Sequence, residues 1–192
     1  MSNAGGMSTI TRYTDMLAGN AAYVAVFGAY ESIATVTVGV GGTSTITFSS
    51  IPSTYTHLQI RAMAQSTTTN QIDMTFNNDT GNNYAGHQLE GTGSAAAAAA
   101  GTSRANMFSM VFVPGTSNSP GGSVIDILDY ASTNKNKTAR ALRGWDNNSS
   151  GNIALISGLW MNTNAITTVT LTARGGTIDQ YSSFALYGIK GA

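Results

Sequence analysis

The chain has 192 residues, of which 9% are charged, and its formal net charge is zero. This balance excludes the basic stripe with which nucleic-acid-binding proteins neutralise phosphates. The most apolar stretch, Met16 to Tyr30, is too short to span a bilayer, so membrane insertion is not expected. There is no cysteine, which excludes thiolate catalysis, cysteine-ligated metals and disulfides. The polar positions are Ser, Thr, Asn and Gly, a neutral surface that suits packing against copies of the same chain.

Residues 1–30 are predicted to form an extended or helical arm that docks on another protein. Asp15 is placed to cap a short helix from Met16 to about Phe27, although Gly and Asn residues within it weaken the helix. A loosely packed terminus is the alternative. The docking interpretation is favoured because an exposed apolar patch needs a partner. The predicted docking residues are Met16, Leu17, Tyr23, Val24, Val26, Phe27 and Tyr30.

Residues 31–192 are predicted to form one all-β domain, an antiparallel β-sandwich with the jelly roll as the leading topology. Short runs alternate apolar and polar residues and are rich in β-branched side chains, which is typical of half-buried strands. The first two runs, joined by Gly41-Gly42, are predicted to form a hairpin. The predicted strands are Ala34–Val40, Ser44–Phe48, His57–Ala64, Gln71–Asn77, Met107–Val113, Ser123–Tyr130, Arg140–Trp145, Ile153–Met161, Thr167–Arg174 and Ser183–Lys190.

Two segments between these strands are predicted to be loops, Asn78–Gly86 and Gly91–Ser103. The second contains six consecutive alanines, Ala95–Ala100, which could form one or two helical turns. Met107–Val113 is apolar on both faces, so it should lie centrally in a sheet or at a subunit interface. The candidate interface residues are Met107, Phe108, Met110 and Phe112.

No motif for catalysis or for a cofactor is complete. Gly91 to Ala96 matches G-x-G-x-x-A, but no βαβ unit surrounds it. The stretch from Asn77 to Asn82 could supply oxygen ligands to calcium, although its spacing does not complete an EF-hand, and an Asx-rich turn is favoured. His57 and His87 are the only histidines, and they stand in no recognised metal or hydrolase motif. We therefore expect no enzyme activity, no cofactor and no metal.

Aromatic residues could form a sugar-stacking platform, as in a carbohydrate-binding module. The alternative is that they fill the sandwich core or a subunit interface. The residues concerned are Tyr130, Trp145, Trp160, Tyr181 and Tyr187.

Several sequence blocks together resemble a family of small virion proteins encoded by tailed bacteriophages, common among aquatic and cyanobacterial phages. The likeness covers about residues 31–190 and leaves the arm outside it. The blocks are ESIATVTV at 31–38, ITF at 46–48, IPSTYTHLQIR at 51–61, FNNDTGNNY at 76–84, ILDYASTNK at 127–135 and FALYGIK at 184–190.

The resemblance implies a place on the surface of a phage particle and brings no catalytic residues. A capsid decoration (cement) protein is favoured, with the arm attached to the major capsid protein and the sandwich in a closed homo-oligomer, a trimer. The first alternative is a tail, neck or fibre component that contacts the host surface, including its glycans, but a fibre usually carries a longer shaft or repeats. The second alternative is a carbohydrate-binding module.

Overall fold

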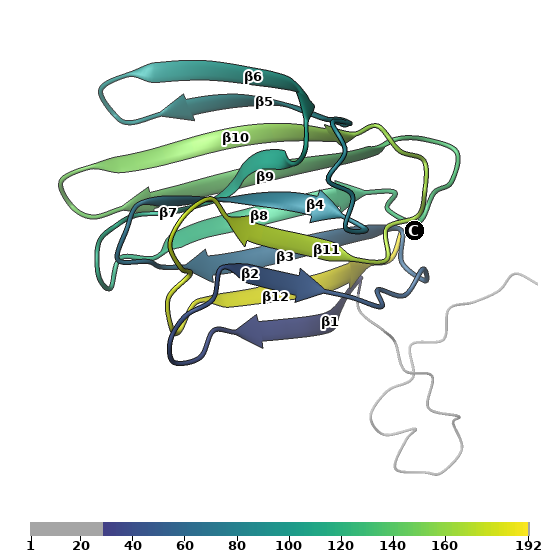
Figure 1. Cartoon of the computed structure of the whole chain (residues 1–192), viewed down its shortest axis with the longest axis horizontal. Coiled ribbons are helices and arrows are strands. Elements are labelled where there is room, and N and C mark those ends of the chain that lie inside the picture. The colour runs from purple at the N-terminus through teal and green to yellow at the C-terminus, as the bar shows by residue number, and fades with distance from the viewer. Residues whose placement is uncertain (1–28, 192) are drawn as a thin grey trace, which may run out of the picture.

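The computed structural model describes residues 29–191, and these residues form twelve strands and no helix. The strands make two antiparallel sheets that pack face to face, which confirms the predicted β-sandwich (Figure 1). In spatial order the large sheet consists of β1 (Tyr30–Thr37), β12 (Ser183–Ile189), β3 (His57–Ala64), β8 (Gly121–Leu128), β9 (Lys137–Asp146), β10 (Gly151–Trp160), β5 (Tyr84–Gly91) and β6 (Ala96–Arg104). The small sheet consists of β2 (Thr45–Phe48), β11 (Val169–Ala173), β4 (Asn70–Phe76) and β7 (Met107–Val113).

Eight of these strands have the connectivity of a jelly roll. The order β1-β12-β3-β8 forms one half and the order β2-β11-β4-β7 forms the other. The chain alternates between the two halves along β1-β2-β3-β4 and again along β7-β8-β11-β12. This is the double Greek key of a jelly roll, so the topology favoured by the sequence is present.

The predicted hairpin at Gly41-Gly42 is wrong. β1 pairs with β12 in the large sheet, whereas β2 pairs with β11 in the small sheet. The two glycines have φ angles of 90° and 70°, and next to them Thr43 forms an isolated bridge with Ile178. The turn therefore carries the chain from one sheet to the other. The residues of a turn do not by themselves specify whether the two flanking strands pair with each other or enter different sheets.

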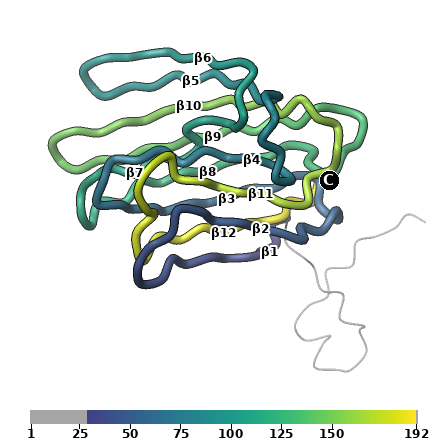
Figure 2. The backbone as a smooth tube through the Cα atoms, viewed as in Figure 1, coloured from purple at the N-terminus to yellow at the C-terminus, as the bar shows by residue number. Residues whose placement is uncertain are grey.

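Two hairpins are added to the jelly roll, and both extend the large sheet beyond β8. The β9–β10 hairpin lies between β8 and β11 in the chain, and the β5–β6 hairpin lies between β4 and β7. Figure 2 shows the backbone of the β5–β6 hairpin at the top of the molecule, past the strands of the small sheet. The large sheet is therefore about twice as wide as the small sheet that covers it.

The β5–β6 hairpin replaces the predicted loops. Residues 78–86 were expected to be a loop, but β5 begins at Tyr84, and the alanine run is a strand rather than a loop or a helical turn. Gly93 has a φ angle of +85° in the four-residue turn between the strands, a conformation that glycine adopts without steric cost. Alanine is a weak strand former, so pairing with β5 overrides the local preference of the run.

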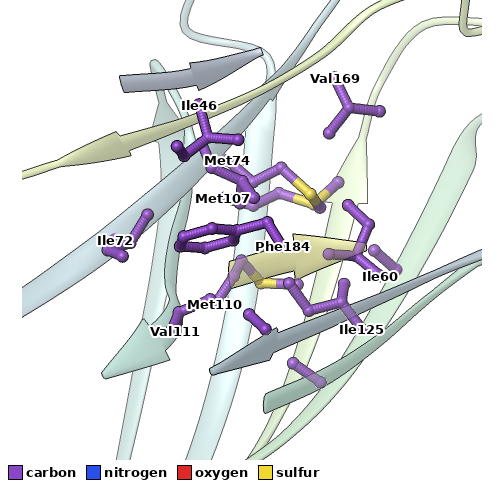
Figure 3. Packing of buried hydrophobic residues seen from close by; sticks show 14 of the residues in the cluster. Ile46, Ile60, Ile72, Met74, Met107, Met110, Val111, Ile125, Val169 and Phe184 are labelled. Atoms are coloured by element: carbon purple, nitrogen blue, oxygen red, sulfur yellow. The ribbon is translucent and has the colours of Figure 1, made fainter. Parts of the chain in front are cut away.

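The core lies between the jelly-roll halves. The residues expected to point inward from β3 and β4 are buried, among them Leu58, Ile60 and Met74. Figure 3 shows Phe184, Ile60 and Ile125 of the large sheet close to residues of the small sheet. A second group of rings packs at one end, where Phe76 meets Trp160 edge-on with ring centroids 5.6 Å apart. The indole of Trp160 also stacks on Tyr84 at 6.3 Å.

The apolar residues of β7 are used inside this chain. Met107 and Met110 are 1% and 0% exposed, so the prediction that they form a subunit interface is corrected: they belong to the core. Met107 reaches Gly158 of β10, where an added Cβ would lie 2.6 Å from the methionine Sδ. β7 is an edge strand of the small sheet, and the wider large sheet beneath it supplies the extra buried area that its sequence requires.

The other two candidate interface residues are half-buried. Phe108 lies under the guanidinium of Arg104, 4.9 Å from its ring centroid. Phe112 stacks on Trp145 of β9 with centroids 5.7 Å apart. Both rings therefore have partners within the chain.

A buried arginine joins the added hairpins to the small sheet. Arg143 on β9 is 1% exposed and donates hydrogen bonds of 3.0 Å to Ser109 Oγ on β7 and to Asn152 Oδ1 on β10. Its Nη2 lies 3.6 Å from Glu90 Oε2 on β5, and its guanidinium lies 5.0 Å from the ring centroid of Phe112. Burial lowers the pKa of Arg143 to about 10, and the charge of Glu90 partly opposes that shift, so the side chain is charged at neutral pH.

The hydrogen bonds continue across the small sheet. The backbone N–H of Ser109 donates to Asp73 Oδ1 at 2.7 Å, and the same carboxylate accepts from Arg174 Nε at 2.9 Å. Ser109 has a φ angle of 61°, and the pairing of β7 with β4 shifts at this point. The irregularity turns a backbone N–H and a hydroxyl toward Asp73 and Arg143, so it serves the polar network.

Replacing Phe76 by Ala should lower the free energy of unfolding by about 3–5 kcal/mol, because the ring is fully buried and its removal leaves a cavity. Chemical denaturation monitored by tryptophan fluorescence measures the loss. A loss below about 1 kcal/mol would contradict the packing described for this strand.

Replacing Arg143 by Met should lower the free energy of unfolding by about 3 kcal/mol, because Glu90 and Ser109 lose their charged partner. Arg140→Met is the matched control on the exposed outer side of the same strand, and it should change stability by no more than about 0.5 kcal/mol. Equal losses in the two variants would show that the buried network does not hold the added hairpins.

Candidate functional site

The outer face of the large sheet, the side turned away from the small sheet, carries a continuous row of apolar residues. Val124 pairs with Leu142, Leu142 with Leu155, Leu155 with Leu89, and Leu89 with Ala98, each directly across from the next. We call this set the apolar row. It crosses β8, β9, β10, β5 and β6 without interruption.

The side chains of the apolar row are exposed to solvent in the single chain. Leu89 is 57% exposed, Leu142 49% and Leu155 58%. Ile153 and Met63, both 60% exposed, lie one row away on the same face. Single exposed apolar residues are common, whereas contiguous apolar patches are typical of surfaces that contact a partner.

The outer face is hollowed along this row. A hollow of about 1010 Å³ is lined by Leu89, Val124, Leu142 and Leu155 together with His87 and Asp126 at its border. A second hollow of about 830 Å³ shares Val124 and Leu142 and extends to Met63 and Ile153. The two therefore form one shallow concave surface on the large sheet.

A polar row borders the apolar one. His87, Ser157, Arg140 and Asp126 are successive cross-strand partners on β5, β10, β9 and β8. Asp126 in turn accepts a hydrogen bond of 2.8 Å from Gln59 Nε2. An apolar strip beside a hydrogen-bonding strip is the arrangement of a protein–protein contact, with an apolar centre and a polar rim.

Tyr30 lies at the β1 end of this face. It is the first residue of β1, is paired with Ile189, and is 50% exposed, so it belongs to the sheet and not to the predicted arm. The guanidinium of Arg61 lies 5.9 Å from its ring centroid and 5.5 Å from that of Tyr187. The other predicted docking residues lie outside the described residues: Met16, Leu17, Tyr23, Val24, Val26 and Phe27.

Sequence reasoning missed the apolar row, although β10 carried a signal for it. Ile153, Ala154, Leu155 and Ile156 are four consecutive apolar residues, a run without the alternation of a strand that is buried on one face only. In the structure Ala154 and Ile156 are buried, whereas Ile153 and Leu155 are exposed. The run therefore indicated that both faces of the strand meet apolar surroundings.

The aromatic residues do not form a sugar-stacking platform. Trp160 is 1% exposed and donates from Nε1 to Asp79 Oδ2 at 2.7 Å, while Trp145 is stacked on β7 between the sheets. Tyr130 is fully buried, Tyr181 is 75% exposed and Tyr187 lies on the outer face. The alternative interpretation, that tryptophans fill the interior, is confirmed for Trp160.

The Asn-rich segment after β4 is a turn held by hydrogen bonds between its side chains and the backbone. Asn77 has a φ angle of 51°, and its side-chain oxygen accepts from the backbone N–H groups of Thr167 and Thr168 at 2.8 and 3.1 Å. Asp79 accepts from the Gly81 N–H at 2.9 Å and from Asn83 Nδ2 at 2.7 Å. The Asx-turn interpretation is therefore confirmed.

The remaining candidate residues stand apart. His57 Nδ1 accepts from the backbone N–H of Asp129 at 2.9 Å, whereas His87 lies on the outer face, separated from β3 by three strands. Asp129 pairs with Lys135 at 2.6 Å, away from Asp126 on the outer face. Among residues 29–191, no three acidic or histidine side chains gather where they could hold a metal ion.

No protein-family model matches the chain, and neither a curated protein nor a solved structure matches it. In the described part of the chain, no helix is long and apolar enough to cross a membrane.

The turn around Asp79 should make stability depend on pH. Burial raises the pKa of this carboxyl, but hydrogen bonds from Asn83, Gly81 and Trp160 outweigh it, so the pKa lies below the usual value of 3.8. A lowered pKa contributes stability that is present above the unfolded-state value and is lost as the pH falls through the folded-state value.

Asp79→Asn should therefore cost about 1–2 kcal/mol of unfolding free energy at pH 7, and the difference from the unmodified protein should shrink below pH 4. Urea denaturation at pH 7, 5 and 3 measures both quantities. A difference that stays constant over this range would show that the Asp79 charge does not contribute.

Proposed function

We propose that this protein is a non-enzymatic structural component of a bacteriophage particle, and within that class a capsid decoration protein on the virion surface. The observation that carries the proposal is the apolar row on the outer face, in a chain of which only 9% of residues are charged. The phage-like sequence blocks of residues 31–190 supply the class of particle, and the jelly roll is a fold that viral capsid proteins use repeatedly.

The apolar row is suited to packing against another structural subunit. Leu89, Leu142, Ile153 and Leu155 are each about half exposed, and covering them would contribute on the order of 3–6 kcal/mol. The occupant that we propose is a shell protein of the particle, since a lattice of identical subunits offers an extended surface of matching size. The residues before β1 serve in this proposal as a second attachment, an arm on the major capsid protein.

A tail, neck or fibre position is the alternative within the same class, and it differs in the number of copies per particle. The carbohydrate-binding alternative has lost its main support, because Trp160 is buried and Trp145 is stacked between the sheets. Glycan binding at the host surface would have to use the exposed Tyr30 and the half-buried Tyr187 beside Arg61.

The number of copies per purified particle, measured by gel densitometry against the major capsid protein, tests the location. A ratio between one to one and one to a few supports a decoration protein. A ratio of one to tens or hundreds places the protein in the tail or neck and overturns the decoration assignment. Absence of the protein from purified particles would overturn the proposal as a whole.

The double variant Leu142→Ser, Leu155→Ser tests the docking face. Both side chains are exposed in the single chain, so the unfolding free energy should change by less than about 1 kcal/mol. Its binding to particles that lack the protein should weaken by about tenfold or more, because apolar area is no longer buried in the contact.

The control is Val40→Ser, which removes an 88% exposed apolar side chain from a loop away from this face. It should bind particles like the unmodified protein. Equal binding of the double variant and of the control would contradict the role of the apolar row.

A further inference from the structure

β6 is an open edge of the large sheet. It is nine residues long, and Ala96–Ala100 are all exposed. Within residues 29–191 it pairs with β5 on one side and with no strand on the other. An unpaired strand of this length is a template for another strand, and proteins usually protect such an edge with charges, proline, a bulge or a short length.

The other edges of the two sheets are protected or irregular, whereas β6 is not. β1 carries Glu31 and a register shift between Ser32 and Ala34, and β2 has only four residues. β7 has a register shift in its pairing with β4 and is followed directly by Pro114. Along β6 the pairing with β5 is regular from Ala96 to Gly101, and no charged residue or proline occurs between Ala95 and Ser103.

The hydrogen-bonding pattern shows which backbone groups are available. The N–H of Thr92 donates to the Ala95 carbonyl at 3.0 Å and closes the β5–β6 turn. Along a strand of an antiparallel pair, the backbone N–H and C=O groups of successive residues alternately bond to the partner strand and point away from it. Counted from this turn, Ala97 and Ala99 bond to β5, whereas Ala96, Ala98 and Ala100 direct their N–H and C=O groups outward.

This edge is complementary to itself. In a two-fold contact each residue near the axis meets its own counterpart, so a charge there would face a like charge. β6 avoids that repulsion because the run around Ala98 is alanine on both faces. The methyl groups also leave room for a second strand to approach on the whole length of the run.

We propose that β6 of one molecule pairs antiparallel with β6 of a second copy about a two-fold axis at Ala98. Ala98 faces Ala98 of the second copy, and Ala96 of each molecule faces Ala100 of the other, which gives about six inter-chain hydrogen bonds. The two large sheets become one continuous sheet, and the apolar rows of both copies meet because Leu89 lies directly beside Ala98 on the same face.

The proposal is independent of the function proposed above and applies to the purified protein. Alanine methyl groups bury little area, so the contact falls at the small end of specific interfaces, below about 1,200 Å² in total. We therefore expect a dimer that dissociates on dilution. The contact is two-fold and differs from the trimer expected from the sequence.

Sedimentation velocity of the full-length protein tests the proposal. At about 100 µM the unmodified chain should sediment with the mass of two chains, and Ala98→Lys should sediment as one chain because two lysines would meet on the axis. Val40→Lys is the matched control: it adds the same charge at an 88% exposed loop position and should remain a dimer.

Ala98→Pro is the second variant. The N–H of Ala98 points away from β5, so proline removes a donor from the proposed contact without removing one from the β5–β6 pair. It should also sediment as one chain. Amide hydrogen exchange gives a direct readout: the amides of Ala96, Ala98 and Ala100 should exchange about tenfold more slowly or better at 100 µM than in Ala98→Lys.

Three results would overturn the proposal. The first is an unmodified protein that is a monomer at 100 µM, which would leave a strand of a different protein as the occupant of this edge. The second is a trimer that both Ala98 variants leave unchanged. The third is fast exchange of the three outward amides in a dimeric protein, which would place the dimer contact elsewhere.

Discussion

The buried guanidinium of Arg143 adds a polar link to the apolar contacts that join the added hairpins to the small sheet. The jelly-roll halves bury their facing sides in one core, which also takes in Ala139 of β9, Ile156 of β10 and Tyr84 of β5, while the exposed strand β6 extends the large sheet further. Arg143 lies beside β7, the edge strand of the small sheet, and its contacts reach β7, β10 and β5. The hydrogen bonds and the ion pair offset the cost of burying this charge, although Nε has no hydrogen-bond partner among the described residues, and they fix the position of the added hairpins relative to β7.

The two surfaces that we interpret functionally both belong to the large sheet. Within residues 29–191 nothing packs on the outer face of the large sheet, and its last strand, β6, pairs with β5 on one side only. Leu89, Leu142 and Leu155 on the outer face, and the outward backbone groups of Ala96, Ala98 and Ala100, are therefore open to the contacts that we propose. Both surfaces are nearly free of charge, which lowers the desolvation cost of covering them.

The two surfaces are distinct, so they can act at the same time. The apolar row lies on the outer face of the large sheet. The β6 contact extends the sheet at its edge and leaves that face open. Pairing through β6 would double the length of the apolar row and present two copies to one partner surface. Two linked copies bind a repeated lattice more tightly than one, because the second contact forms at high effective concentration.

Local sequence pattern was sufficient for most of the strands but not for their partners. The alternation in His57–Ala64 and Gln71–Asn77 fixes which residues point inward, and Leu58, Ile60 and Phe76 are indeed buried. The Gly41-Gly42 turn was interpreted as a hairpin because adjacent strands often pair, but here the chain crosses to the other sheet. The alanine run has no strand preference of its own, and it extends only because β5 offers a ladder of hydrogen bonds.

The sequence by itself determined the all-β class, the inward face of each alternating strand and the low charge of the surface. Only the tertiary structure decided that Met107 and Met110 belong to the core while Leu142 and Leu155 remain exposed, although all four are apolar residues in strands. The physical reason is that burial depends on what packs across a strand. That packing comes from residues distant in the chain, such as Gly158 against Met107 and Arg143 against Ser109.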